Sequence, residues 1–390
     1  MNTTRSFITI LIACWFTSMQ LSAQSDLNTI EETELDSIVK SKFKVTIGGQ
    51  LKLNGNYDFN ALQNYESFNV PSIPTGSNSD NSNRLSLGVR QSRLKLETLY
   101  NSPSIGLVSC YFEGDFFGQG TFNFRLRHFY VDLKSFRVGQ SWSVFTDEDA
   151  WPDVIDFDGP PTGIWVRAAQ IRYTKNFNNT KWAISLETPR PDIRQVAEID
   201  STLTETYQGF PDLATHINTS GNWGHAQLAF VYRKLHYKSS EKTLSSHAGG
   251  VALSGSLNIG KHDKIIAQGT IGKGIASYLV SFGGGGYDAI PDGTGDLQLL
   301  PIYGGYVAYE HWWAPTKLKS TFVYGLTHLE ADVEKFSHRK SIARFYSGNL
   351  FWLLDDHITT GIEALYGDVE DFNRESGDAF RIEFMLLFNF

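Results

Sequence analysis

The sequence predicts an all-β protein, and more specifically a transmembrane antiparallel β-barrel of sixteen strands with an inward-folded constriction loop. Three observations support this fold class. Aromatic residues make up 14% of the 390 residues and glycine occupies 35 positions, whereas charged residues reach only 19%, below the ~25% usual for soluble domains. No run approaches the ~18 apolar residues of a membrane helix. Long stretches instead alternate apolar and polar residues with a period of two, as β-strands do.

The first 23 residues are typical of a cleaved secretory signal peptide. Arg5 supplies a basic start, Phe7–Phe16 an apolar segment, and Leu21-Ser22-Ala23 the small-residue cleavage pattern. A lipoprotein signal ending at Cys14 is the alternative. An exported chain with this composition is expected in the bacterial outer membrane.

Residues 24–43 are expected to form a periplasmic segment, and residues 44–390 the barrel. Ser25–Lys42 is polar, with scattered apolar residues, and fits either a flexible leader or a short self-associating helix. Cleavage of the signal would leave Cys110 as the only cysteine, so an internal disulfide is excluded. The stability must therefore come from elsewhere, such as a closed hydrogen-bonded barrel.

The two ends of the predicted barrel show the alternation most clearly. Apolar residues or glycines occupy every second position from Val45 to Phe59, with polar residues between them, and apolar residues occupy every second position from Phe380 to Phe390. This exceeds the ~5–6 residues of a typical globular strand. It suits tilted membrane-spanning strands whose apolar side chains face lipid and whose polar side chains face a lumen.

Similar segments recur between these ends, joined by short turns on one side and longer loops on the other, as in outer-membrane barrels. The predicted strands lie at residues 44–60, 84–100, 104–115, 120–133, 135–143, 165–176, 180–188, 211–220, 222–235, 244–260, 263–274, 300–313, 316–328, 340–354, 357–370 and 377–390. Sixteen strands would enclose a water-filled lumen. A barrel of eight to twelve strands with large loops is the alternative. The glycine-rich stretch Ser281–Gly295 could contain a hairpin within a loop.

The loop Phe145–Gly163 has an unusual composition, with three prolines, six carboxylates and no basic residue. Loops of this length in a compact domain usually have a function. We expect this loop to fold into the lumen and narrow it. Its carboxylates are Asp147, Glu148, Asp149, Asp153, Asp156 and Asp158.

Basic residues concentrate in the strands of the first half of the chain. An arginine facing lipid at the bilayer midplane costs about 2–4 kcal/mol, so these side chains should face the lumen or a neighbouring protomer. The expected pore-lining residues are Arg93, Lys95, Arg125, Arg127, Arg137 and Arg172. Opposite the acidic loop they would create a transverse field, and arginines favour carboxylates and phosphates. Alternatively, arginines and acids pair only to hold the loop against the wall.

Two local details concern these strands. The alternation slips between Val89 and Leu94, which a β-bulge would explain. His128 and Asp132 fall on the face expected to point outward, which suggests that this side of the barrel packs against another protomer.

Other chemistries find little support in the sequence. The acidic loop could offer oxygen ligands to Ca²⁺, but it lacks the spacing and central glycine of a calcium-binding loop. No catalytic motif, zinc-ligand spacing or phosphate-binding loop is present, so neither enzymatic activity nor a cofactor or metal is expected. The formal net charge of −8 argues against a nucleic-acid partner.

The central segment 124–174 resembles the DcaP-like trimeric outer-membrane porins. The matching elements are Leu126-Arg127-His128, Val138–Ser143, Pro152–Phe157, Gly159-Pro160 and Gln170–Tyr173, with Arg90–Leu94 resembling a motif of the second strand. The resemblance implies a sixteen-stranded homotrimer, in contact with the lipid bilayer and lipopolysaccharide of the outer membrane, that admits small anionic solutes. It places Asp147–Asp158 in the inward-folded loop and Arg125, Arg127 and Arg172 in the lumen wall. The acidic net charge and the glycine-rich loop depart from the family pattern.

Three functions therefore compete. The first is a passive porin for small hydrophilic, carboxylate-type solutes. The second is a non-conducting barrel with a structural or surface-binding role through its long loops. The third is a barrel enzyme such as a lipid hydrolase, for which the sequence shows no Ser/His pair.

Overall fold

The computed structural model describes residues 43–390 except 61, 63, 77–82, 119–121, 195–207, 239–242, 292–295, 332–335 and 337–338. The predicted signal peptide and the segment up to residue 42 lie outside the described residues. By its internal contacts the chain divides into two units, Met1–Lys44 and Val45–Phe390, and the second holds the barrel. Within the described residues, no helix is long and apolar enough to span a membrane.

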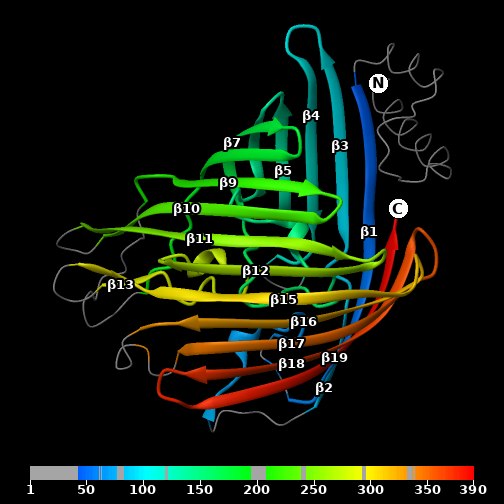
Figure 1. Cartoon of the computed structure of the whole chain (residues 1–390). Helices are drawn as coiled ribbons and strands as arrows, with labels where there is room; N and C mark the ends of the chain where they lie inside the picture. The colour runs from blue at the N-terminus through cyan, green and yellow to red at the C-terminus, as the bar shows by residue number, and fades with distance from the viewer. Residues whose placement is uncertain are drawn as a thin grey trace, which may run out of the picture. The chain divides into compact units, whose positions relative to one another are not determined.

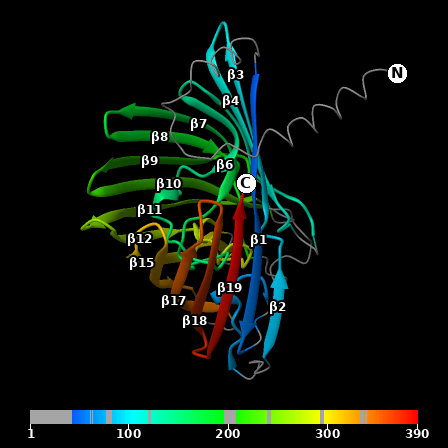
Figure 2. The ribbon, with the colours of Figure 1, turned by 90° about the vertical axis from the view of Figure 1, so that its right-hand side faces the viewer.

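The barrel is one antiparallel sheet that closes on itself, because β1 pairs with β19 on one side and with β2 on the other (Figures 1 and 2). Its segments are β1 (Phe43–Asp58), β2 (Arg84–Gly88), β3 (Arg93–Ser102), β4 (Gly106–Asp115), β5 (Arg125–Leu133), β6 (Phe136–Trp142), β7 (Arg167–Phe177), β8 (Thr180–Glu187), β9 (Asp212–Gly221), β10 (Gly224–Lys238), β11 (Thr243–Ile259), β12 (Asp263–Lys273), β15 (Pro301–Ala314), β16 (Leu318–Leu329), β17 (Lys340–Leu353), β18 (Ile358–Asp371) and β19 (Ser376–Asn389). Since β2 and β3 are two parts of one strand, the barrel has sixteen strands, as predicted.

The interruption between β2 and β3 lies where the alternation slips in the sequence. A tight turn occupies residues 89–92, in which the Ser92 N–H donates to the Val89 carbonyl at 3.0 Å. The predicted irregularity is therefore confirmed, although it is a turn within the strand and not a single-residue bulge.

A second irregularity corrects one prediction. The pairing of β4 with β5 shifts register between Glu113 and Gly114, which leaves Arg127 as an extra residue in β5. A bulge of this kind moves the following side chains to the opposite face. His128 consequently lines a cavity in the lumen, and Asp132, four residues further along β5, shares its face. The expectation that these two residues point outward was wrong.

The outward face of the strands is apolar. Leu85 and Leu87 in β2 are 69% and 72% exposed. Such an extended exposed apolar surface is unusual for a protein in water and suits contact with hydrocarbon. Further large side chains exposed in the same way include Val45, Ile47, Leu107, Phe129, Val138, Ile171, Leu253, Ile271, Phe322, Ile362 and Phe384.

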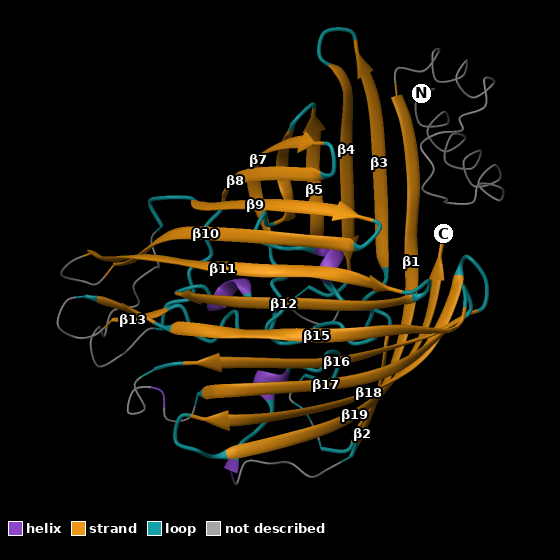
Figure 3. Cartoon of the chain, viewed as in Figure 1, coloured by secondary structure: helices purple, strands orange, loops and turns teal. Residues whose placement is uncertain are grey.

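The interior contains a hydrophobic cluster in addition to polar groups. Four connections fold inward and contribute to it: the loop after β1, the loop after β6, the connection from β12 to β15 and the connection from β16 to β17, represented by Phe68, Phe145, Phe282 and Phe336. Figure 3 shows these loops and short helices behind the front strands. The short elements are the 3-10 turns η2 (Val70–Ser72), η4 (Glu148–Ala150) and η5 (Ala276–Tyr278), and the hairpin β13 (Ala289–Pro291) and β14 (Leu297–Leu299). The glycine-rich stretch thus takes part in a loop hairpin, as suggested.

The wall that meets this cluster extends from β8 to β19. Its inward positions carry small or apolar residues, among them Ala183, Ala214, Ala229, Ala252, Ala308, Ala343, Phe345, Leu365 and Ala379. Small side chains leave room for a loop to approach the sheet. Strands β3 to β6 contribute no side chain to the cluster in the described residues. The hydrophobic cluster therefore lies on one side of the lumen, and a cavity of about 460 Å³ lies against strands β3 to β6.

The seam between the first and last strands is joined by a buried ion pair. Arg381 of β19 lies directly opposite Asp58 of β1, and both side chains are fully buried. The Arg381 Nε donates to Asp58 Oδ1 at 2.5 Å, and a second guanidinium nitrogen donates to the Asn64 carbonyl at 2.9 Å. The same arginine thus closes the barrel and fixes the start of the loop after β1.

We expect Arg381→Met to destabilise the barrel by about 3–5 kcal/mol, because two buried carboxylates lose this arginine: Glu383, and Asp58, which among the described residues keeps only Arg84 at 3.2 Å. Urea unfolding in detergent micelles, followed by tryptophan fluorescence, measures the change. Arg374→Met is the control, since this arginine is exposed in the turn after β18 and pairs with Glu370 near the end of that strand. Equal unfolding midpoints for the two variants would refute a structural role for the seam pair.

Candidate functional site

The loop Phe145–Gly163 is held in the lumen mainly through its backbone. The Glu363 carboxylate of β18 accepts hydrogen bonds from the N–H groups of Ile155 and Asp156, at 2.6 and 2.9 Å. The Glu187 carboxylate of β8 accepts from the N–H of Val144 just before the loop, at 2.8 Å. Hydrogen bonds to a carboxylate are about twice as strong as neutral ones, so these two wall residues anchor the loop at its start and in its middle.

Wall side chains also donate to carbonyl groups of the loop. These bonds are Gln227 to Thr146 at 3.2 Å, Tyr306 to Ala150 at 2.8 Å, Asn349 to Asp153 at 2.9 Å, Lys52 to Ile155 at 2.9 Å and Gln268 to Thr162 at 2.9 Å. The donors come from strands around most of the barrel. The loop is therefore fixed from several directions.

Among the predicted carboxylates, Asp147 is buried in a polar cluster on the wall. One of its oxygens accepts from the Ser254 hydroxyl at 2.6 Å and lies 3.0 Å from the His225 Nε2. The other ring nitrogen of His225 contacts the Ser256 hydroxyl at 2.9 Å. Because all of these groups are satisfied by one another, Asp147 ties the first turn of the loop to β10 and β11.

Asp156 and Asp158 join the loop to the connection that follows β1. Asp156 accepts from the Phe68 N–H at 2.7 Å and, within its own turn, from the Gly159 N–H at 2.8 Å. Asp158 accepts from the Ser67 hydroxyl at 3.0 Å and from the Asn69 amide at 3.2 Å. Burial, reinforced by the nearby Asp156 charge, raises the pKa of Asp158 to about 7.

The remaining acids of the loop are more open. Asp153 forms an ion pair with Lys319 of β16 and keeps half of its side-chain surface exposed. Glu148 and Asp149, in the turn η4, are exposed to the lumen. These two carboxylates are therefore the acids of the loop most accessible to a solute.

The arginines of β5 are paired with acids of the neighbouring strand β4. Arg127 contacts Glu113 at 2.5 Å and Asp115 at 2.9 Å, and Arg125 contacts Asp115 at 2.6 Å. Arg93 of β3 lies 3.8 Å from Glu113. The extra residue at Arg127 explains this arrangement, because both arginines and the following histidine can face the lumen together.

The other predicted basic residues have separate surroundings. Arg137 of β6 pairs with Asp132 at 2.8 Å and lies 3.7 Å from the centre of the Tyr130 ring. Arg172 of β7 donates to Gln170 at 3.0 Å and to the Trp142 carbonyl. Lys95 is half-buried and pairs in register with Glu113.

In the described residues, no ion pair joins the six predicted basic residues to the six predicted acids. Their ionic partners are mostly wall residues: Glu113, Asp115 and Asp132 for the arginines, and Lys319 for Asp153. The sequence interpretation named only Asp132 among these, and placed it on the outward face. The alternative in which arginines and loop acids pair to hold the loop is thus not what the structure shows.

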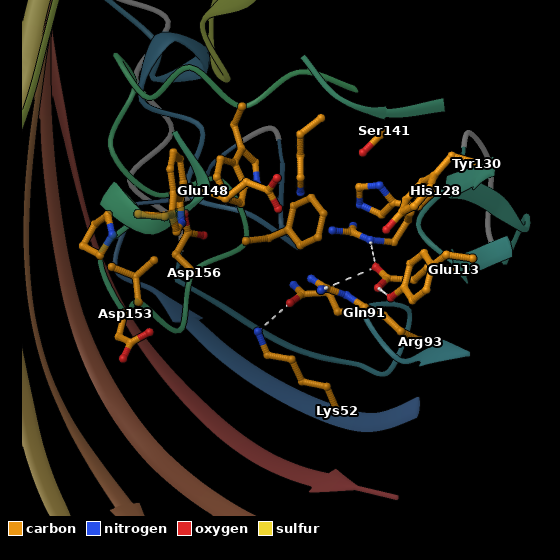
Figure 4. Close-up of a pocket in the computed structure, with 18 of the residues that line it drawn as sticks. Lys52, Gln91, Arg93, Glu113, His128, Tyr130, Ser141, Glu148, Asp153 and Asp156 are labelled. Atoms are coloured by element: carbon orange, nitrogen blue, oxygen red, sulfur yellow. Dashed lines mark hydrogen bonds and ion pairs between the residues drawn. The ribbon is translucent and has the colours of Figure 1, made fainter. Parts of the chain in front are cut away.

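The two charged sets nevertheless face each other across a cavity of about 460 Å³. Arg93 lies on its wall side, and Glu148, Asp153 and Asp156 lie on its loop side (Figure 4). Arg127 and Arg137 also line the cavity from the wall. Three of the six predicted basic residues and three of the six predicted acids therefore meet there. Arg172 faces a separate, smaller cavity that is also lined by Asp147, Glu148 and Asp149, and neither cavity is lined by Lys95, Arg125 or Asp158.

The sequence interpretation missed the aromatic surface of the main cavity. Trp165 lies between Trp142 and Trp151, with ring centres 4.2 and 4.3 Å apart. The guanidinium of Arg167 lies 4.5 Å from the centre of the Trp142 ring. Trp142, Trp151 and Trp165 flank or lie within the acidic loop. Their position in the sequence could therefore have predicted that they line the same cavity as the loop. Lys52, which lines the same cavity, was also missed.

The chain is similar to known outer-membrane proteins in sequence and in fold. The family model of the DcaP outer membrane protein matches residues 18–201. The outer membrane channel DcaP of Acinetobacter baumannii superposes with a TM-score of 0.77 and 21% identity, over 90% of this chain and 98% of that one. Residues 18–201 therefore match the DcaP outer-membrane protein family, and the barrel has the fold of the DcaP channel. The resemblance found in residues 124–174 is thereby confirmed, as is the location in the bacterial outer membrane.

Structures of lower similarity share the barrel fold of this protein. OmpT of Vibrio cholerae has a TM-score of 0.56 at 12% identity, and OmpF of Salmonella typhi has a TM-score of 0.57 at 8% identity. Each alignment covers 90% of this chain and 98% of the other. The curated proteins include no match to the sequence.

Replacing Glu363 with alanine should loosen the constriction loop, because the N–H groups of Ile155 and Asp156 lose their acceptor. Leaving buried polar groups unpaired costs about 1–3 kcal/mol. We expect a larger and noisier single-channel conductance in planar bilayers. Glu370→Ala on the same strand is the control, since Glu370 pairs with Arg374 in the neighbouring turn. An unchanged trace for Glu363→Ala would show that the loop does not depend on this anchor.

The raised pKa of Asp158 predicts a pH dependence of stability. The folded protein binds the proton of the Asp158 carboxyl more tightly than the unfolded chain does, so protonation of Asp158 stabilises the fold. This stabilisation is complete below about pH 4 and is lost as the pH rises to about 7. Asp158→Asn, which stays neutral, should melt at a higher temperature than the wild type at pH 8 and at a similar temperature at pH 4. Circular dichroism melting in detergent measures this. The exposed Asp149→Asn serves as control and should not show the difference.

Proposed function

We propose that this protein is a passive porin for small hydrophilic anions of the carboxylate type. The observation that supports this most directly is the cavity between strands β3–β6 and the acidic loop, where three wall arginines, with Glu113 among them, face three carboxylates of the loop. Such a lining creates a transverse field that orients charged or dipolar solutes. The planar guanidinium groups on the wall suit carboxylates, which they can bind with two parallel hydrogen bonds.

The proposed preference for anions depends on which charged side chains of this cavity already have partners within the protein. Asp156 is satisfied by backbone N–H groups, and Asp153 is paired with Lys319. Arg93 has only a distant partner in Glu113, at 3.8 Å. Glu148 is the main acid of the lining that remains open to solute. Arg93 is therefore the wall cation that a carboxylate would engage first, opposite the open Glu148.

We further propose that the protein works as a homotrimer embedded in the outer-membrane bilayer. The apolar outward face supports the embedding. One of the similar structures, OmpT of Vibrio cholerae, is described in a trimer form. Native mass spectrometry in mild detergent should give a trimer, and a monomer would contradict this part of the proposal.

A non-conducting barrel is the second candidate, because the inward-folded loops fill much of the lumen with a hydrophobic cluster. The two functions make opposite predictions in planar bilayers. A porin shows step-like conductance, whereas a structural or surface-binding barrel stays closed to every ion tested.

Charge substitutions test the anion preference. In water, a unit charge about 6 Å from an ion changes its free energy by roughly 0.7 kcal/mol, about a threefold change in local concentration. The pair Arg93→Gln and Arg137→Gln should therefore lower the anion-to-cation permeability ratio several-fold, and Glu148→Gln with Asp149→Asn should raise it. Reversal potentials in a salt gradient measure the ratio.

Arg374→Gln is the matched control, because this arginine is exposed in the turn after β18 and should leave the ratio unchanged. Channels that conduct but show the same ratio in all variants would contradict the proposed charge selection. An absence of conductance in the wild type would favour the non-conducting barrel.

A further inference from the structure

A groove on the outer surface of the barrel has no part in the proposed pore. It crosses the outward face of β10, β11, β12 and β15, which lie side by side at the front of Figure 1. Gly249 lies in register between Tyr232 of β10 and Lys273 of β12. Since glycine has no side chain, the surface is hollowed at this point, and the whole groove measures about 920 Å³.

We propose that this groove binds a phosphorylated glycolipid of the outer leaflet, namely lipopolysaccharide, with one acyl chain in the groove. The floor supports the acyl-chain part. Phe230, Val251 and Ile271 line it from three adjacent strands and are exposed. In a membrane barrel this outward face meets lipid, and a recessed apolar surface gives a hydrocarbon chain more contact than a flat one.

The polar edge of the groove supports the headgroup part. Lys273 is the last residue of β12 and Glu330 follows the end of β16, so both adjoin long connections. Long connections of outer-membrane barrels are extracellular, which places this edge at the level of the outer-leaflet headgroups. The exposed Lys273 ammonium suits a phosphate.

The other groups of this edge favour a sugar headgroup over a simple phospholipid. The Glu330 carboxylate would repel a phosphate but can accept hydrogen bonds from sugar hydroxyl or amide groups. Two aromatic rings offer flat faces of the kind that sugar rings pack against. Both are held in place: the Tyr232 hydroxyl bonds to His247 Nδ1 at 2.7 Å, and Tyr303 packs on His328 with 4.8 Å between ring centres.

The proposal rests on the outer-membrane location and the outward face, and does not depend on conductance. Its test is a titration of the purified full-length protein, in mild detergent, with bisphosphorylated hexa-acyl lipid A and with the same lipid after removal of its phosphates. Bound lipid is counted by native mass spectrometry. The variants are Lys273→Ala at the edge and Val251→Trp on the floor.

Lys273→Ala should weaken binding of the phosphorylated lipid about tenfold, since a charge-assisted hydrogen bond is lost, and should leave the dephosphorylated lipid unaffected. Val251→Trp fills the floor and should weaken both lipids. Lys175→Ala is the control, because Lys175 is also exposed but belongs to β7, away from the groove. Unchanged binding in both test variants would overturn the proposal.

A second readout addresses the other possible occupant. A photo-reactive residue at position 251 should cross-link to lipid in outer-membrane vesicles. Cross-links to a second copy of the chain would show that a protomer covers this face, and would overturn the proposal as well.

Discussion

The position of the constriction loop depends on charge-assisted hydrogen bonds from its backbone to buried carboxylates of the barrel wall. Glu187 and Glu363 accept N–H groups of the chain from Val144 to Asp156. An irregular loop inside a barrel has many backbone groups without partners, and each one left unpaired is costly. The wall meets this requirement with carboxylates and amides at inward positions. The acids of the loop itself mostly serve as further anchors.

This anchoring gives the lumen an asymmetric interior. The side from β8 to β19 has small inward residues and is packed by four connections, those after β1, β6, β12 and β16. The side from β3 to β6 has charged inward residues and faces the free cavity. The same loop therefore contributes both to the hydrophobic filling, through Phe145, and to the acidic lining, through Glu148. A change in its position would alter the packing and the charge of the constriction together.

Much of the fold could be predicted from the sequence, because a period of two repeated along sixteen segments leaves little choice of architecture. The position of the acidic loop followed from its length and composition. Its contacts could not be predicted, since they join residues such as Asp147 and Ser254 that are distant in the chain. The face of His128 was missed because one extra residue at Arg127 reverses the alternation without a signal in composition.

The interior cluster was missed for a related reason. Alanine at inward positions such as Ala214 and Ala343 gives no clear signal in a pattern of apolar and polar residues. In the structure, these alanines lie where the loops pack against the wall. Glu113 and Asp115 could have been found, because the cost of exposing a charge to lipid applies to acids on β4 as it does to arginines on β5.

If solutes cross the barrel on the side of strands β3 to β6, the accessibility of introduced cysteines tests this most directly. The experiment uses a protein in which Cys110 is replaced by serine and one new cysteine is introduced. The new cysteine stands either at Tyr111, which lines the cavity, or at Ala343, which is buried behind the loops. A small anionic thiol reagent is added during single-channel recording. Reaction should reduce conductance for Tyr111→Cys and not for Ala343→Cys. Equal block at both positions, or block at Ala343→Cys alone, would contradict it.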